Sequence, residues 1–276
     1  MTKIADIRFN DSHSIPQIGI GVWQIPDPKV PSTVSAATKL GCRLIDGAFI
    51  YGNEVGIGEG IRQDDVPRDK LFVTSKVWNS EHGFAKTRSA IEGSLERMGL
   101  EYLDLMLIHW PCPSKDLYVE TWKAMIVAKE DGLVRSIGVS NFEAVHLDRI
   151  IEETGVTPAL NQIEVNPRLQ QIELRAANKK RGIVTQSWTP LGDGASFDAL
   201  AIQAVCARAH KTPAQVILRW HLQLGVSVIP RSSKPEHLAE NLDVFDFEMS
   251  ADEMQEIAKL DEGIRCGPSP MEFEVE

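Results

Sequence analysis

Four ionisable side chains stand close to the ends of short apolar runs, and their types suit carbonyl chemistry. Asp46, Lys76 and His109 each end such a run, and Tyr51 lies in the glycine-containing loop after Asp46. A tyrosine, with an unperturbed pKa of roughly 10, is a weak acid near neutrality, and a nearby ammonium group is expected to lower that pKa. A carboxylate would keep the lysine charged, and a histidine could orient a carbonyl oxygen. The set would suit protonation of that oxygen as hydride arrives at the carbon.

Each of these residues also has a purely structural interpretation. Asp46 and Lys76 could form an ordinary buried ion pair, and Tyr51 could be a loop residue with a satisfied hydroxyl group. His109 could be a core histidine that follows an apolar strand. The pattern of residues alone does not decide between the structural and the catalytic interpretation.

Apolar strands alternate with helical patterns along most of the chain. The strands are predicted at 19–22, 43–46, 71–75, 103–108, 134–139, 159–163, 183–187 and 226–230. Helices are predicted at 31–40, 54–62, 84–98, 116–130, 143–153 and 171–181. Near-continuous apolar strands between helices indicate a parallel sheet covered by helices. Eight strands in a chain of 276 residues favour a closed (β/α)8 TIM barrel, an α/β fold, over an open doubly wound sheet.

The two ends of the chain add to this barrel. Segments 4–9 and 14–18 flank a polar turn and predict an N-terminal β-hairpin. Extra C-terminal helices are expected at 198–210, 213–224 and 250–261, the last two from a Thr-Pro start and a Ser-x-x-Glu capping box. No linker divides the chain, so we expect one domain over residues 1–276. Its glycine- and proline-containing tail, residues 267–276, is expected to be loose.

Composition narrows the class of protein. The formal net charge of −10 argues against a nucleic acid or an anionic membrane as the partner. The N-terminus has no signal-peptide pattern, and no run reaches the roughly 18 apolar residues of a membrane span. Four scattered cysteines without a CxxC pair fit reduced thiols better than a disulfide frame or a zinc site. We therefore expect a cytoplasmic protein without a bound metal.

Polar or large aromatic residues follow every predicted strand. In a TIM barrel the ligand site lies at the carboxyl ends of the strands. One polar residue at such a place is common, but a full set favours a ligand-lined mouth. The set comprises Trp23, Asp46, Lys76, His109, Trp110, Ser140, Asn141, Gln162, Glu164, Trp188, Arg231 and Ser232.

Ordered motifs along nearly the whole chain resemble those of the aldo-keto reductases. They lie at residues 19–23, 44–54, 75–78, 107–111, 132–142, 161–164, 187–192 and 229–232. Within that family the chain looks most like bacterial 2,5-diketo-D-gluconate reductases, partly through Trp188 and the short tail. The family needs no GxGxxG fingerprint, so the absence of that motif does not argue against a dinucleotide cofactor.

The resemblance implies NADPH-dependent reduction of a carbonyl group. By this likeness Tyr51 is the general acid, Lys76 and Asp46 lower its pKa, and His109 orients the substrate. The implied nicotinamide contacts are Ser140, Asn141 and Gln162, with Trp188 stacked on the ring. Pro190, Leu191 and Gly192 are further implied cofactor contacts. The implied contacts of the adenosine phosphate end are Arg231, Ser232, Ser233, Lys234, His237, Glu240 and Asn241.

Three positions depart from the usual pattern of the family. Gly47 stands where threonine is usual, which is expected to loosen local packing without removing chemistry. Arg231 replaces a lysine and can still pair with a phosphate. His237 replaces an arginine and is largely neutral at pH 7. We therefore expect NADPH to be preferred, with NADH also accepted to some extent.

The resemblance also outlines a substrate pocket and an oligomeric state. Trp23, Phe49, Trp78, His109 and Trp110 would frame the pocket, together with Tyr51. Because the tail is short, little is expected to close the mouth, which suggests small, polar carbonyl substrates. A monomer is expected from the family.

Two other functions fit parts of the sequence less well. Some relatives bind NADPH as sensors or regulatory subunits without catalysis, but the presence of all four catalytic-type residues disfavours this. A metal-dependent hydrolase would need several histidine or aspartate ligands at the strand ends, and only one of each stands there.

Overall fold

Eight parallel strands form the centre of the molecule in the computed structural model, which describes residues 4–275. They are hydrogen-bonded in chain order from β3 to β10. Two bridges, Ile18 to Val228 and Gly21 to Arg231, join the last strand to the first and close the sheet. The predicted (β/α)8 barrel is confirmed. The strands are β3 (Ile20–Gly21), β4 (Leu44–Asp46), β5 (Phe72–Val77), β6 (Leu103–Ile108), β7 (Val134–Ser140), β8 (Leu160–Glu164), β9 (Val184–Trp188) and β10 (Ser227–Val228).

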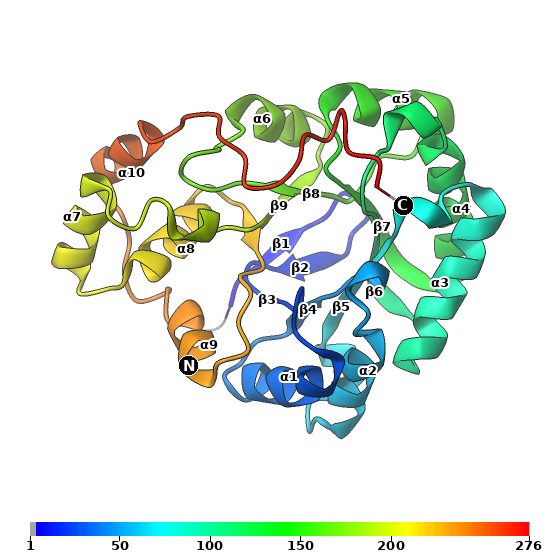
Figure 1. The fold of residues 1–276 in the computed structure, drawn as a ribbon, viewed down its shortest axis with the longest axis horizontal. Coiled ribbons are helices and arrows are strands. Elements are labelled where there is room, and N and C mark those ends of the chain that lie inside the picture. Colours follow the sequence, from blue (N-terminus) through cyan, green and yellow to red (C-terminus); the bar gives the residue numbers. More distant parts are fainter. Residues whose placement is uncertain (1–3, 276) are drawn as a thin grey trace.

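The helices form a ring around these strands (Figure 1). They are α1 (Val30–Lys39), α2 (Glu54–Gln63), α3 (Phe84–Met98), α4 (Tyr118–Glu130), α5 (Ala144–Thr154), α6 (Ile172–Lys180), α7 (Leu200–Ala209), α8 (Pro213–Gln223), α9 (Pro235–Leu242) and α10 (Ala251–Ala258). The starts of α8 and α10 follow from their sequences. Thr212 with Gln215, and Ser250 with Glu253, form reciprocal capping boxes. No helix of residues 4–275 is long and apolar enough to cross a membrane.

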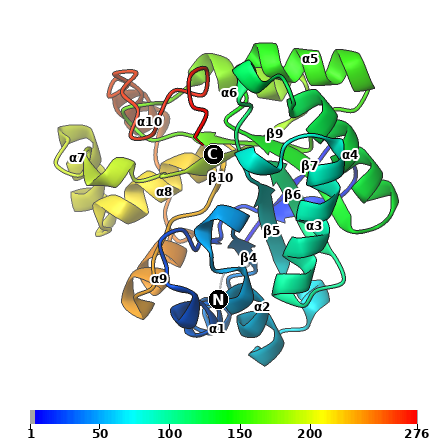
Figure 2. The same cartoon turned by 45° about the vertical axis from the view of Figure 1, so that its right-hand side comes forward.

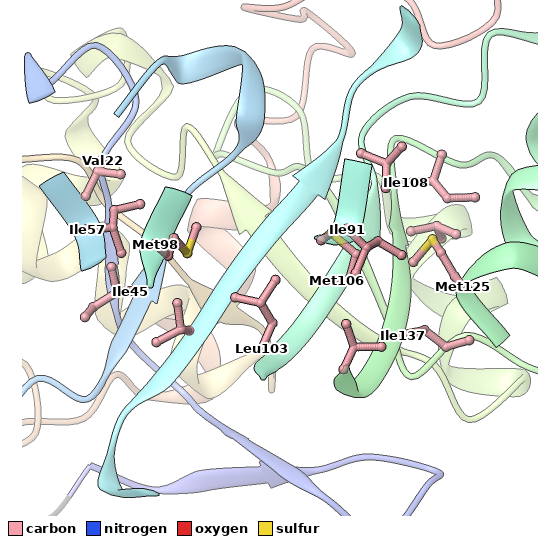
Figure 3. Packing of buried hydrophobic residues seen from close by; sticks show 14 of the residues in the cluster. Val22, Ile45, Ile57, Ile91, Met98, Leu103, Met106, Ile108, Met125 and Ile137 are labelled. Atoms are coloured by element: carbon pink, nitrogen blue, oxygen red, sulfur yellow. The ribbon is translucent and has the colours of Figure 1, made fainter. Parts of the chain in front are cut away.

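The core has two faces because the strands are apolar on both sides. On β6, Met106 and Ile108 belong to the large cluster between strands and helices, whereas Leu105 and Leu107 belong to a cluster inside the barrel. Figure 3 shows part of the outer cluster, where Ile45 of β4 faces Ile57 of α2. Burial on both faces explains why these strands read as continuous apolar runs rather than alternating ones.

The predicted N-terminal hairpin is present and covers one end of the barrel. It consists of β1 (Asp6–Arg8) paired antiparallel with β2 (Ser14–Pro16). Phe9 and Ile15 of the hairpin pack in the same cluster as Leu105 and Leu107. The carboxyl ends of the strands lie at the opposite end of the barrel, where a TIM barrel carries its ligand site.

The structure differs from the sequence prediction at three places near the C-terminus. β10 is shorter than the predicted strand 226–230, and Pro230 has no N–H to extend the ladder. The helix α9 was not predicted, although Pro235 at its first turn is a typical start. The tail was expected to be loose, and that prediction is wrong. It runs from α10 back over the strand ends (red in Figures 1 and 2) and is held there by hydrogen bonds.

Candidate active site

Lys76 and Asp46 form a buried ion pair at the carboxyl ends of β4 and β5. Lys76 Nζ lies 2.5 Å from Asp46 Oδ1 and also donates to the carbonyl oxygen of Gly47 at 2.9 Å. Both side chains are almost fully buried. Burial alone would lower the pKa of Lys76, but the charge of Asp46, helped by Tyr51, raises it above its usual value. The ammonium group therefore stays charged inside the protein.

Tyr51 ends a short 3-10 turn, Phe49–Tyr51, that follows β4. Its hydroxyl oxygen lies 3.5 Å from Lys76 Nζ. The sequence led us to expect a lowered pKa for Tyr51, but burial raises it, and the charge of Lys76 opposes that rise only in part. The phenol therefore holds its proton at neutral pH, and the ammonium group stands ready to stabilise the phenolate that proton transfer would leave.

His109 follows β6 and faces Tyr51. The two rings meet edge to face with centroids 5.8 Å apart, and the ring of Trp78 lies 5.0 Å from that of His109. Burial first, and then the charge of Lys76, hold the pKa of His109 well below its usual value, so the imidazole is neutral. Its Nδ1 is buried without a hydrogen-bond partner among residues 4–275. Nε2 is then the nitrogen left to meet a ligand.

The residues expected at the nicotinamide are connected to one another and to the ion pair. Ser140 Oγ donates to the carbonyl oxygen of Gln162 at 2.8 Å. Asn141 Nδ2 donates to the carbonyl oxygen of His109 at 3.0 Å, and its Oδ1 accepts from Trp188 Nε1 at 2.8 Å. Gln162 Nε2 donates to Asp46 Oδ2 at 2.8 Å. The predicted cofactor and catalytic groups thus form one hydrogen-bonded unit.

A cavity of about 600 Å³ opens beside this unit. Of the predicted residues it is lined by Trp23, Asp46, Tyr51, Trp78, His109, Trp110, Ser140, Asn141, Gln162, Trp188, Pro190, Leu191 and Arg231. Phe49 does not line it, because its ring packs under the guanidinium group of Arg97 at 4.8 Å. The sequence did not single out Ile50, Thr189, Asp193, Phe197, Cys266 and Phe273, which also line it. Thr189 and Asp193 flank residues 190–192, which were predicted to contact the cofactor. That position in the sequence was the one signal that could have identified them.

The segment expected to hold the adenosine phosphate begins beside this cavity. Arg231 Nη1 lies 2.5 Å from Gln24 Oε1, and its guanidinium group lies over the ring of Trp23 at 5.6 Å. Beyond it Ser233, Lys234 and His237 are exposed around the start of α9, where helix N–H groups favour an anion. Glu240 accepts a hydrogen bond from Thr212, and Ser232 and Asn241 are buried. Together with Gly192, these residues beyond Arg231 lie outside the lining of the cavity.

Comparison with known proteins decides the family. The model of the aldo/keto reductase family matches residues 17–262. An aldo-keto reductase of Mycolicibacterium smegmatis (strain ATCC 700084 / mc(2)155) is 48% identical over 267 residues, which is 97% of each chain. The chain belongs to the aldo/keto reductase family. It is an oxidoreductase of that family, as the resemblance of its motifs implied.

Two further relatives bear on the chemistry of this aldo/keto reductase. The methylglyoxal reductase DkgA of Escherichia coli (strain K12) is 46% identical over 269 residues, 97% of each chain. The solved structure of a point mutant of Gox0644 in complex with NADPH is 46% identical, with a TM-score of 0.94 over 99% of each chain. The likeness therefore extends to the whole barrel, including the strand ends that carry the site.

The tail of this aldo/keto reductase forms one wall of the cavity, contrary to the expectation that little would close the mouth. The ring of Phe273 lies 4.4 Å from that of Trp110 and 6.3 Å from that of Trp78. Asn79 Nδ2 donates to the carbonyl oxygen of Val275 at 2.8 Å. At the start of the tail the buried carboxylate of Glu164 accepts from two consecutive backbone N–H groups, those of residues 266 and 267. Side chains far away in the sequence thus fix the tail.

The packing around Gly47 is not loose, contrary to the expectation from the sequence. A Cβ atom at this position would stand 2.5 Å from Cδ1 of Ile57. The side chain of Ile57 therefore fills the space that a side chain at position 47 would take. No group of three or more His, Cys, Asp or Glu side chains within residues 4–275 is arranged to hold a metal ion.

Proposed function

We propose that this aldo/keto reductase uses NADPH to reduce small, polar carbonyl compounds to alcohols, with Tyr51 as the proton donor. The observation that carries the proposal is the phenol of Tyr51, which lies 3.5 Å from a buried, charged ammonium group at the wall of the cavity. His109, on the same wall, offers a neutral ring nitrogen to the carbonyl oxygen.

Each catalytic residue has one task in this proposal. When bound, NADPH would supply the hydride for the carbonyl carbon. His109 Nε2 holds the carbonyl oxygen close to the hydroxyl group of Tyr51. Tyr51 transfers its proton to that oxygen, which completes the alcohol, and Lys76 stabilises the phenolate. Asp46 keeps Lys76 charged and in place.

The residues along the cavity fit the chemistry of this cofactor. Ser140, Asn141 and Gln162 offer hydrogen-bonding groups for a carboxamide, and Trp188 offers a flat ring on which the nicotinamide can stack. Arg231 and Lys234 supply cationic groups for phosphate oxygens near the start of α9. The related Gox0644 mutant was solved in complex with NADPH, which supports the choice of cofactor.

The limited size of the remaining space supports small substrates. Phe273, Trp78 and Trp110 close one side of the cavity, so a bound nicotinamide leaves limited room beside His109. Methylglyoxal is the first substrate to test, because one relative carries the name methylglyoxal reductase. Keto-sugar acids such as 2,5-diketo-D-gluconate are the second class, from the resemblance of the motifs.

The test compares NADPH oxidation by the wild-type protein and by Tyr51→Phe with methylglyoxal as the substrate. We expect the variant to lose about 10²- to 10⁴-fold in kcat, the usual contribution of a general acid. NADPH affinity, measured by quenching of tryptophan fluorescence, should be retained. The matched control is Tyr118→Phe, which removes a hydroxyl group outside the cavity lining and should keep full activity.

The outcomes separate the proposal from its alternative. A wild-type rate that survives in Tyr51→Phe would mean that another group donates the proton. Tight NADPH binding without turnover of methylglyoxal, 2,5-diketo-D-gluconate or a panel of small aldehydes would favour a cofactor-binding sensor over an enzyme.

A further inference from the structure

A continuous chain of hydrogen bonds runs from the catalytic carboxylate through the interior of the barrel to the N-terminal hairpin. Gln162 Nε2 donates to Asp46 Oδ2 at 2.8 Å and to Gln186 Oε1 at 2.7 Å. Gln186 Nε2 donates to Ser227 Oγ at 3.1 Å, and that hydroxyl group donates to the carbonyl oxygen of Pro16 at 3.2 Å. The four side chains that these hydrogen bonds connect, those of Asp46, Gln162, Gln186 and Ser227, are almost fully buried. The proposed mechanism makes no use of Gln186 and Ser227.

The two ends of this chain fix the direction of every hydrogen bond in it. The carbonyl oxygen of Pro16 can only accept, so Ser227 must give it its single proton and accept from the amide nitrogen of Gln186. The oxygen of Gln186 then faces Gln162 and requires an amide nitrogen there. From the other end, the carboxylate of Asp46 is paired with Lys76 and requires the same nitrogen. Both ends therefore select one orientation of the Gln162 amide.

The consequence appears at the wall of the cavity. Both hydrogens of Gln162 Nε2 are committed inside the barrel, and no hydrogen bond within residues 4–275 has its Oε1 as the acceptor. Gln162 also lines the cavity. Its oxygen is therefore the group that it offers to a ligand, and it requires a hydrogen-bond donor.

We infer that Gln186 and Ser227 are positioning residues that hold the Gln162 amide with its oxygen toward the cofactor, so that the site selects a pyridine nucleotide whose ring substituent donates an N–H group. This inference rests on the proposed function, because it assumes that the nicotinamide lies beside Gln162. A reversed amide would set the Gln162 oxygen against two buried acceptors, Asp46 Oδ2 and Gln186 Oε1. Without Gln186 only one of these contacts would oppose the reversal.

The experiment measures binding rather than turnover, with NADP⁺ and its 3-acetylpyridine analogue as probes. The analogue keeps the ring carbonyl and replaces the amide nitrogen by a methyl group, so it cannot donate to Gln162. We expect the wild-type protein to bind NADP⁺ up to about tenfold more tightly than the analogue, the worth of one neutral hydrogen bond. Dissociation constants come from quenching of tryptophan fluorescence.

Two substitutions at position 186 test the inference directly. Gln186→Met removes one of the two acceptors, so that only Asp46 still opposes a reversal of the Gln162 amide, and the affinity ratio should fall about threefold or more. Gln186→Glu keeps an acceptor oxygen and should keep the wild-type ratio. Ser227→Ala is the second route if Gln186→Met does not fold, because it frees Gln186 to turn, and it should also lower the ratio. Gln17→Met is the matched control, since this amide donates to a backbone carbonyl away from the cavity lining.

The outcomes are distinguishable. A fall in the ratio with Gln186→Met, restored with Gln186→Glu, supports the inference. Equal loss of affinity for both probes, or an unchanged ratio in both Gln186→Met and Ser227→Ala, overturns it and leaves these residues a structural role only. A wild-type protein that binds neither probe overturns the proposed function itself.

Discussion

Lys76, His109 and Tyr51 share one small buried volume, yet Lys76 is charged whereas His109 and Tyr51 are neutral. Asp46 holds Lys76 charged, burial and the Lys76 charge keep His109 neutral, and burial keeps Tyr51 protonated, as the directions of their pKa shifts show. A donor that keeps its proton until negative charge develops beside it is suited to carbonyl reduction. The sequence could predict which residue types meet here, because each one ends a strand or lies in the loop beside it. It could not predict the direction of the Tyr51 shift, which depends on how deeply the loop is buried.

We expect a few exposed residues around the start of α9 to set the preference for NADPH over NADH. With His237 in place of the usual arginine, we expect kcat/KM for NADPH and NADH to differ by less than about a thousandfold, roughly 4 kcal/mol. His237→Arg should widen the ratio about tenfold by adding a charged partner for the 2′-phosphate. His237→Ala is the control and should change it little. A larger wild-type ratio in steady-state rates with both cofactors would contradict this prediction.

The tail is the element that sequence analysis described least well. Its glycines and prolines fit the irregular backbone that the structure shows, but irregular backbone is not the same as a loose segment. The partners that hold it are remote: Asn79 is 196 residues from Val275, and Glu164 is 102 residues from Cys266. No local pattern carries such contacts. Phe273 could not be predicted as a site residue for the same reason, because only its packing on Trp110 places it at the cavity.

Removing the aromatic ring from the tail should alter the range of substrates. Phe273→Ala opens the wall beside Trp110, so we expect KM for methylglyoxal to rise several-fold and kcat/KM for a bulky aromatic aldehyde to rise relative to it. Met271→Ala is the control, because Met271 is an exposed residue of the same tail outside the cavity lining. Steady-state rates with the two aldehydes check the prediction. Equal changes for both substrates would show that the ring does not set the size limit.

At the scale of the whole molecule the sequence was most informative. Eight apolar runs alternating with helices allow few closed arrangements, and in a closed barrel the ligand site lies at the carboxyl ends of the strands. This topology, with polar or aromatic side chains after each strand, is enough to predict a ligand-lined mouth. The helix α9 was the element missed, because its eight residues were interpreted only as a phosphate-binding segment.

Buried histidines should make the whole fold sensitive to acid. Burial lowers the pKa of His82 to about 4, and that of His109 also lies well below 6.5. Below about pH 6.5 these histidines bind protons in the unfolded chain but stay neutral in the folded protein. The free energy of unfolding therefore decreases as the pH falls. For His82 alone this amounts to about 2 kcal/mol between pH 7 and pH 5.

Urea unfolding at pH 7 and pH 5 checks this prediction. His82→Gln should reduce the loss of unfolding free energy between the two values, because the variant has no proton to gain there. His237→Gln, which removes an exposed histidine, should leave the loss unchanged. An identical pH dependence in wild type and His82→Gln would contradict the prediction.

The sheet closes at a narrow seam between β3 and β10, and local opening of the barrel should begin there. Only a few backbone hydrogen bonds cross between the short strands β3 and β10 and their flanks within residues 4–275, among them Gly19 N–H to Val228 and Gly21 N–H to Pro230. Gly21 and Arg231, which meet across the seam, both line the cavity. A dinucleotide bound there would span both sides of the join. In the empty enzyme these amides should exchange with solvent deuterium ahead of those of β6, and the cofactor should slow them first.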